Sequence, residues 1–325
     1  MPWLSGLVAS LRTARLAVFG LCLVSGAAAD TGLELRAEEI APGAYHVPAP
    51  VAVWSGHAHG HVANTGFVVG ERCIAVIDTG GSPTVGRALL AAVRRVSALP
   101  VCHVINTHVH PDHVLGNAAF ARTGPMGAAP QFVGHARLPA ALASRGPFYL
   151  NAVRRDFEGE DRLAALVPPT VLVQDTLELD LGHRVLVLRA WPTAHTDSDL
   201  TVLDRGSDTL WLGDLVFRVH LPVLDGKLLG WRAVLQSLRG LSASLAVPGH
   251  GPVMRDWPAG LEPTATYLQH LDDEVRTALR AGWTLAETVS RLGAGPAASR
   301  SGWMLVEDFH RRNVTAAYAE LEWSD

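Results

Sequence analysis

The stretch "VCHVINTHVHPDHVLGN" (residues 101–117) is the most informative part of this chain, because an apolar run ends there in a dense group of polar side chains. The group comprises His108, His110, Asp112 and His113. Burying such groups without partners would cost roughly 2–7 kcal/mol each, so a hydrophobic core is a poor place for them. A solvated loop has no need of so many imidazoles. Imidazole nitrogens and carboxylate oxygens bind metal ions, so the stretch predicts a metal site at the end of a strand.

Three later segments repeat this arrangement, and each places one candidate ligand where an apolar strand ends. They are "WPTAHTDSD" with His195, "LWLGDLVF" with Asp214 and "LAVPGHGP" with His250. A rigid sheet fixes such side chains, while the loops remain free to shape a pocket. The chain therefore offers five histidines and two carboxylates, which is enough for two metal ions.

The hydrophobic pattern predicts one domain in which mixed sheets are covered by helices. The 325 residues are 48% hydrophobic and 18% charged, which suits a globular protein with a large core. In the first half, we expect strands over 64–70, 73–81, 101–108 and 131–135, and helices over 82–98, from 113 onwards and over 136–165, with Pro147 interrupting the last. Later we expect hairpins turning at Gly182-His183 and Arg205–Asp208, a helix over 230–241, a strand over 244–251 and mostly helix after Leu261.

The ordered set H-x-H-x-D-H, a lone histidine, a lone aspartate and G-H-G resembles the metallo-β-lactamase superfamily, from about "NTGFVV" to "PGHGP". The resemblance implies an α/β (α+β) fold, a four-layer αββα sandwich of two mixed sheets flanked by helices. That domain would cover residues 30–325 and include a helical C-terminal segment. The resemblance also implies a site for two zinc ions. One ion would be held by His108, His110 and His195, the other by Asp112, His113 and His250, with Asp214 bridging both.

The same resemblance implies a chemistry for this site. Two ions about 3.5–4 Å apart share a metal-bridging hydroxide of lowered pKa, which attacks a carbonyl or similar centre. Asp112 would orient this nucleophile and is the expected catalytic residue. Asp78, which ends the strand "CIAVID", would brace the ligands from behind. Candidate pocket residues are His59, from the loop "WSGHAHGHVANTGF", and His220, which shortly follows Asp214.

A narrower resemblance lies in "AHTDSDLTVL", "LGDLVFRVHLPVLDG", "GWRAVLQSL" and the ending "RRNVTAAYAELEW". These segments resemble the SoxH-related group called quinoprotein relay system zinc metallohydrolases. That resemblance implies an exported hydrolase of an ester, thioester or amide bond in a small-molecule substrate, associated with a periplasmic quinoprotein (PQQ-dependent) dehydrogenase system. Two alternatives stay open. One is a mononuclear iron persulfide dioxygenase, and the other is a non-catalytic metal-binding accessory protein of a quinoprotein system.

Residues 1–29 have the pattern of a secretory signal peptide. Arg12 and Arg15 form a positive n-region, Leu16–Gly26 is apolar, and small residues precede the expected cut before Asp30. The apolar stretch is shorter than the roughly 20 residues that a membrane-spanning helix needs. We therefore expect cleavage, no membrane span in the mature chain and a periplasmic location.

The charge balance argues against nucleic acid as a partner, because the net charge is −4 and no basic run is present. Loss of the signal peptide would make the mature chain more acidic still. It would leave Cys73 and Cys102, each at the start of an apolar strand. These strands could lie side by side in one sheet. A disulfide and two buried free thiols are both compatible with this pattern.

Overall fold

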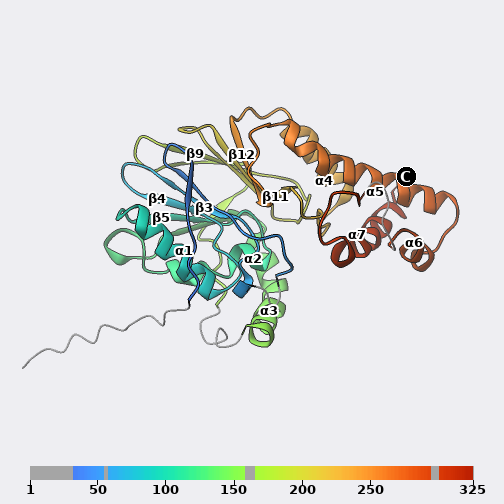
Figure 1. Ribbon diagram of the computed structural model, residues 1–325, viewed down its shortest axis with the longest axis horizontal. Helices are drawn as coiled ribbons and strands as arrows, with labels where there is room; N and C mark the ends of the chain where they lie inside the picture. The colour runs from blue at the N-terminus through green and yellow to red at the C-terminus, as the bar shows by residue number, and fades with distance from the viewer. Residues whose placement is uncertain (1–31, 55–57, 158–164, 294–299, 325) are drawn as a thin grey trace, which may run out of the picture. The chain divides into compact units, whose positions relative to one another are not determined.

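Two mixed β-sheets pack face to face at the centre of the structure, a computed structural model (Figure 1). It describes residues 32–54, 58–157, 165–293 and 300–324. Leu33–Asp325 form one compact unit. The predicted signal peptide, residues 1–29, lies outside the described residues, so its cleavage stays a prediction. Among the helices that are described, none is both long and apolar enough to cross a membrane.

The first sheet has seven strands in sequence order. From β1 to β4 each strand is antiparallel to its neighbour, whereas β4 to β7 run parallel. Parallel neighbours need crossover connections, and helix α1 (Pro83–Val96) lies in the connection between β4 and β5. The strands are β1 Glu38–Ala41, β2 Ala44–Val47, β3 Thr65–Val69, β4 Ile74–Ile77, β5 Val101–Ile105, β6 Gln131–His135 and β7 Val171–Val173.

The second sheet has five strands in the order β12-β11-β10-β9-β8. Both predicted hairpins are confirmed, because β8 pairs with β9 and β10 with β11 in antiparallel fashion. Strands β11 and β12 are parallel, and helix α4 (Leu228–Leu238) lies between them in the chain. The strands are β8 Thr176–Asp180, β9 Val185–Ala190, β10 Leu200–Asp204, β11 Thr209–Phe217 and β12 Leu245–His250.

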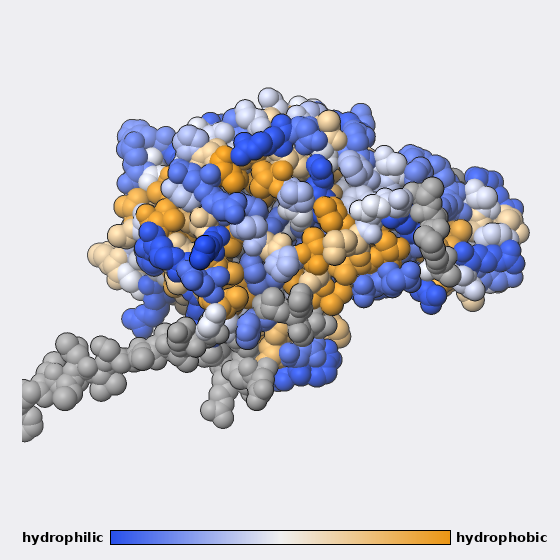
Figure 2. Space-filling view, in the orientation of Figure 1, coloured by the Kyte–Doolittle hydropathy of each residue, from blue (hydrophilic) through white to orange (hydrophobic). Residues whose placement is uncertain are grey.

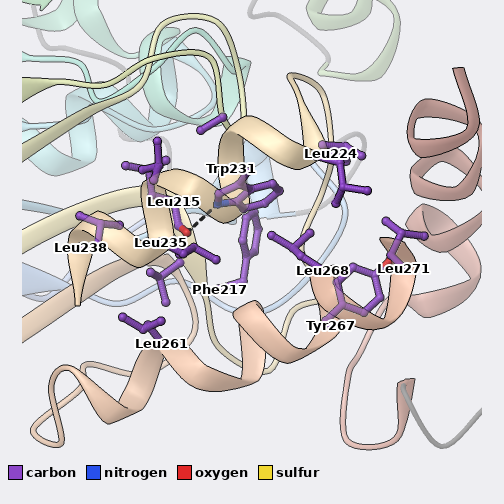
Figure 3. Packing of buried hydrophobic residues seen from close by; sticks show 14 of the residues in the cluster. Leu215, Phe217, Leu224, Trp231, Leu235, Leu238, Leu261, Tyr267, Leu268 and Leu271 are labelled. Atoms are coloured by element: carbon purple, nitrogen blue, oxygen red, sulfur yellow. Dashed lines mark hydrogen bonds between the residues drawn. The ribbon is translucent and has the colours of Figure 1, made fainter. Parts of the chain in front are cut away.

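Helices cover the outer face of each sheet, which confirms the predicted αββα sandwich. Leu89 and Val93 of α1 pack on the first sheet, and α4, α5 and α7 contribute to the core on the second. Figure 3 shows Trp231 of α4 in this second core, where its Nε1 donates to the carbonyl of Leu215 at 2.9 Å. The remaining helices are α2 Pro111–Val114, α3 Leu138–Asp156, α5 Glu262–Arg280, α6 Leu285–Leu292 and α7 Val306–Leu321, with short 3-10 turns η1 Ala58–Gly60, η2 Asn117–Phe120, η3 Pro125–Gly127 and η4 Ala259–Leu261.

Two helices differ from their predicted form. The helix expected from residue 113 begins at Pro111 and ends after one turn at Val114, and the chain then continues into the 3-10 turn η2. Helix α3 runs through Pro147 without interruption and ends at Asp156. Pro147 and Ala143, whose carbonyl loses its usual helical donor, are both exposed, so water can satisfy that carbonyl.

Cys73 and Cys102 are joined by a disulfide. Cys73 directly precedes β4 and Cys102 lies in β5, and these strands are parallel neighbours, as the sequence suggested. The two Cα atoms are 5.8 Å apart. Of the two alternatives that the sequence left open, the structure therefore contains the bridge rather than two free thiols.

Candidate metal centre

All seven candidate ligands lie together, on or just after strands of both sheets. The stretch after β5 supplies four of them, the β9–β10 connection one, and β11 and β12 one each. In each of two groups, one ligand atom per residue lies within 4.8 Å of all the others. The first group is His108, His110, His195 and Asp214, and the second is Asp112, His113 and His250. This division follows the one implied by the sequence, and metal binding by the two groups stays a prediction.

The ring nitrogens of the first group converge on one point. The Nε2 atoms of His108 and His195 each lie 3.0 Å from Nδ1 of His110. The outer nitrogen of His110 donates to Oδ2 of Asp225 at 3.1 Å, and that of His195 donates to the carbonyl of Val223 at 2.6 Å. Because these oxygens only accept, each outer nitrogen carries a hydrogen. The inner nitrogens of the rings face one another.

Asp78 holds one histidine from each group, from behind. Its carboxylate accepts hydrogen bonds at 2.8 Å from the backbone N–H of Thr107, from Oγ1 of Thr107 and from Nδ1 of His113. Oγ1 of Thr107 lies 3.1 Å from Nδ1 of His108 and accepts its hydrogen. Both histidines are thus held at Nδ1, so that Nε2 of each ring faces the other candidate ligands. Asp78 itself has φ of 55°, a left-handed conformation that is uncommon outside glycine and costs energy.

Asp214 lies between the two groups. Its Oδ2 is 3.5 Å from Nε2 of His195 and 3.3 Å from Nε2 of His250, and its Oδ1 is 3.4 Å from Nε2 of His113. A Cβ at Gly249 would overlap Oδ1, so only glycine leaves room for the carboxylate here. Within the described residues, the buried atoms His113 Nε2 and Asp214 Oδ1 have no hydrogen-bond partner.

Protonation differs between the groups. In the first, burial and then the neighbouring His110 lower the pKa of His195 to about 3, so this ring is neutral. In the second group, burial lowers the pKa of the imidazoles, but the neighbouring carboxylates raise it by more. Asp78 raises the pKa of His113 well above its usual range, and Asp214 raises the pKa of His250 to about 9. Without a metal, the second group therefore holds two imidazolium ions beside carboxylates.

This arrangement fits a metal ion better than a network of hydrogen bonds. Converging lone pairs repel one another unless a cation lies between them, and buried polar atoms without partners are costly. Neutral imidazoles and carboxylates are the donors that zinc takes in proteins. A cation in the second group would displace the protons of His113 and His250 and keep the same carboxylate partners. The residues present therefore fit one metal ion at each group.

A cavity of about 450 Å³ opens onto both groups, a volume typical of small-molecule sites. Its polar lining includes ligands from each group and the predicted pocket residue His220. The ring centre of His220 is 4.7 Å from that of His250, and its Nδ1 donates to the carbonyl of Leu221 at 2.6 Å. The aromatic lining residues are Trp54, Phe148, Tyr149, Phe217 and Phe309.

His59 is not among the residues that line this cavity. It lies exposed in η1 with φ of 56°, and this left-handed turn leaves its ring in solvent, so the pocket position expected for it is not found. Its neighbour His61 is buried instead and donates from Nε2 to the carbonyl of Pro48 at 3.0 Å. His57, from the same loop, lies outside the described residues.

The sequence reasoning missed two residues that position the first group. Oδ2 of Asp225 accepts from His110 and also from Nη2 of Arg145 at 3.0 Å. Arg145, on α3, also binds Oδ1 of Asp197 at 3.2 Å, two residues after His195 in the chain. Asp225 is the next-to-last residue of the segment "LGDLVFRVHLPVLDG". Nothing in that segment indicates a contact with His110, which lies 115 positions earlier.

A family model described as the metallo-beta-lactamase superfamily matches residues 58–250. Among curated proteins, a linear primary-alkylsulfatase from Pseudomonas sp. (strain ATCC 19151) is 42% identical over 45 residues. That match covers 14% of this chain and only 8% of the alkylsulfatase.

Solved structures of a metallo-β-lactamase and of an alkylsulfatase are similar in fold to most of this chain. A metallo-β-lactamase from Pontibacter korlensis has a TM-score of 0.57 and 21% identity, covering 73% of this chain and 99% of that one. The stereoselective inverting sec-alkylsulfatase Pisa1 from Pseudomonas sp. has a TM-score of 0.66 and 15% identity, covering 87% of this chain and 50% of that one. The chain thus matches about half of this sulfatase. At these identities, the likeness shows a shared fold and nothing more.

Proposed function

This chain belongs to the metallo-β-lactamase superfamily, and on that premise we propose that it is an exported dinuclear zinc hydrolase of an ester, thioester or amide bond. Superfamily membership and the cluster of histidines and aspartates support a metallo-hydrolase. The observation that carries the proposal is the complete second group, Asp112, His113 and His250, buried beside the complete first group and open to the same cavity.

Each ligand would contribute to hydrolysis in its own way. Zinc bound at both groups would provide an activated water, because metal coordination lowers the pKa of water toward neutrality. The neutral rings of His108 and His195 need lose no proton to bind. Asp214, between the groups, offers one carboxylate to both. Asp112 lines the cavity, and its Oδ2 is 3.3 Å from Nε2 of His250, so it can orient the attacking water and hold the proton that the water loses.

The second group also favours a dinuclear zinc hydrolase over a mononuclear iron dioxygenase. Among the described residues, a single ion in the first group would leave Nε2 of His113 buried without a hydrogen bond, 3.4 Å from Oδ1 of Asp214. A second ion would use that atom. The cavity in turn favours an enzyme over a non-catalytic accessory protein, because a storage or transfer site does not need an aromatic pocket in front of its ligands.

Export and a link to a quinoprotein system are part of the same proposal. The signal-like pattern of residues 1–29 supports export to the periplasm. The bridge between Cys73 and Cys102 agrees with this, since disulfides persist in oxidising compartments. The association with a periplasmic quinoprotein dehydrogenase is supported by the segment resemblance alone. Deleting the gene would test it, and unchanged dehydrogenase activity would count against it.

A substrate panel tests the hydrolase. Zinc-loaded protein is assayed with esters, thioesters, amides and lactams, and with a linear alkyl sulfate because one relative is an alkylsulfatase. We expect turnover of one carbonyl class that chelation abolishes and zinc restores. Asp112→Ala should abolish it, whereas His59→Ala, which changes an exposed histidine outside the cavity, should not. Full activity of Asp112→Ala would refute the mechanism, and oxygen uptake with a persulfide would favour the iron alternative.

A further inference from the structure

Two arginines line the cavity, Arg145 and Arg312, and they differ in whether neighbouring carboxylates form ion pairs with them. Arg145 is held between two carboxylates, with Nη2 3.0 Å from Oδ2 of Asp225 and Nη1 3.2 Å from Oδ1 of Asp197. These ion pairs neutralise Arg145 and fix it as part of the support for the metal centre. Arg145 is therefore not available to bind a ligand charge.

Arg312, on α7, has no such partner among the described residues. Across the described part of the chain, no carboxylate forms an ion pair with it, and its one recorded contact is aromatic. Its guanidinium carbon lies 5.9 Å from the ring centre of Phe309, the residue one turn earlier on the same helix. The side chain is exposed and lines the cavity. Arg312 thus brings to the pocket of an acidic protein a positive charge that no carboxylate of the described residues neutralises.

A row of rings joins this charge to the metal centre. Phe309 lies 5.1 Å from His220 between ring centres, and His220 lies 4.7 Å from His250. Arg312 is the outer end of this row, and the ligand His250 is its inner end. A ligand that lies along the row would therefore have one end at the metal centre and the other at the guanidinium.

The walls between these ends are apolar. Phe148 lines the cavity and is 67% exposed, so its ring offers apolar surface to a ligand. Trp54 and Tyr149 line the same space. Figure 2 shows hydrophobic side chains gathered on the face between α3 and α7, the two helices that carry Phe148 and Phe309. Such walls favour an apolar stretch of ligand.

The charges at the inner end decide which way a ligand lies. At the inner end, bound metal would match the carboxylates of Asp112 and Asp214, and Arg145 pairs with Asp225, so among the described lining residues Arg312 is the arginine left for a second negative group. The same group is attracted by Arg312, whose planar guanidinium can bind a carboxylate with two parallel hydrogen bonds.

We infer that the substrate carries an anionic group, separated from the bond to be cleaved by an apolar stretch, and that Arg312 binds this group. This inference rests on the proposed function, since it names the class of substrate that the proposed hydrolase would cleave at the metal centre. Arg312 is a specificity-determining residue in this scheme, and it takes no part in bond cleavage.

Binding of dicarboxylates tests the inference without requiring turnover. Calorimetry on zinc-loaded protein would use a series from succinate to sebacate, each compared with the monocarboxylate of equal length. One carboxylate can occupy the metal centre in either ligand, but only a dicarboxylate has a second for Arg312. At the length that spans the cavity, we expect the dicarboxylate to bind about tenfold tighter, as a charge-assisted hydrogen bond gives.

Variants assign this preference to one side chain. Arg312→Ala should remove it, and Arg312→Lys should keep part of it. Arg311→Ala is the matched control, because this neighbouring arginine lies outside the cavity and donates from Nε to the carbonyl of Gly293 at 3.2 Å. No preference at any length in the wild type would overturn the inference. A preference that survives in Arg312→Ala, or is lost equally in Arg311→Ala, would overturn it as well.

Kinetics separate this inference from the proposed function. With paired neutral and carboxylate-bearing esters, Arg312→Ala should raise KM about tenfold for the anionic ester and leave kcat and KM for the neutral ester unchanged. If no ester is hydrolysed but the dicarboxylate preference needs Arg312, the hydrolase proposal fails and the anion site stands. If both esters are hydrolysed and Arg312→Ala slows them equally, the hydrolase stands and the anion site fails.

Discussion

Asp78→Asn should selectively weaken metal binding by the second ligand group. The carboxylate of Asp78 is buried and accepts three hydrogen bonds, of which Oδ2 accepts those from Oγ1 of Thr107 and Nδ1 of His113. In Asn, the amide oxygen can still accept from the backbone N–H of Thr107 (2.8 Å in the wild type), which places the NH₂ group where Oδ2 was. An NH₂ group there faces the N–H of His113, so two donors meet.

The ring of His113 resolves this conflict by moving its hydrogen to Nε2, the nitrogen that the metal needs. Loss of such an outer partner typically lowers metal affinity about 10–100-fold, which corresponds to roughly 1.4–2.7 kcal/mol. The effect on the first group should be smaller, because His108 reaches Asp78 only through the hydroxyl of Thr107.

Competition with a chromophoric chelator measures both zinc affinities separately. The control is Asp180→Asn, which removes a carboxylate that is largely exposed, at the end of β8. Circular dichroism of the metal-free proteins would establish that both variants fold. Unchanged affinity of the second group in a folded Asp78→Asn protein would refute the reasoning, as would an equal loss in Asp180→Asn.

Three further results are expected. Asp225→Asn should lower the zinc affinity of the first group more than that of the second, because His110 loses an anionic acceptor. An equal loss of affinity at both groups in the same chelator competition would contradict this. Chelation should lower Tm, since metal binds only the folded chain, and zinc should restore it; an unchanged Tm would argue against occupied sites. Burial, helped by Arg300, lowers the pKa of His310 to about 4 from 6.5. Between these values the unfolded state binds more protons, so stability should fall with falling pH by at most about 1.4 kcal/mol per unit, less with solvent screening. Denaturant unfolding of His310→Gln should show a weaker fall, and an equal one would contradict the assignment.

The positions of the candidate metal ligands could be predicted because six of the seven follow or end an apolar strand, where a sheet holds polar side chains, whereas Asp214 lies within β11. That pattern is local, so a short stretch of sequence reveals it. Asp78 followed from the same logic, because it directly follows β4, the neighbour of β5. His220 is similar, since it lies shortly after the β11 strand that carries Asp214.

Positions set by distant contacts could not be predicted in this way. Arg145 and Asp225 meet only when α3 packs near the loop after β11, and neither lies in a pattern that differs from an ordinary polar surface. His59 does not occupy the pocket position predicted for it, for a related reason. Its backbone adopts a left-handed conformation that the sequence pattern does not reveal. Strand β7 has three residues, too few to show an alternating pattern. Helix α3 tolerates Pro147 because that face is exposed, which only packing reveals.

Elemental analysis of the mature protein, purified from its native compartment without added metal, tests the central claim most directly. Two complete ligand groups predict about two zinc ions per chain, and removing the second group's ligand His250 by His250→Ala should reduce this to about one. About one iron per chain in the wild type, or a protein that takes up only one zinc ion when titrated with excess zinc, would contradict the dinuclear zinc account.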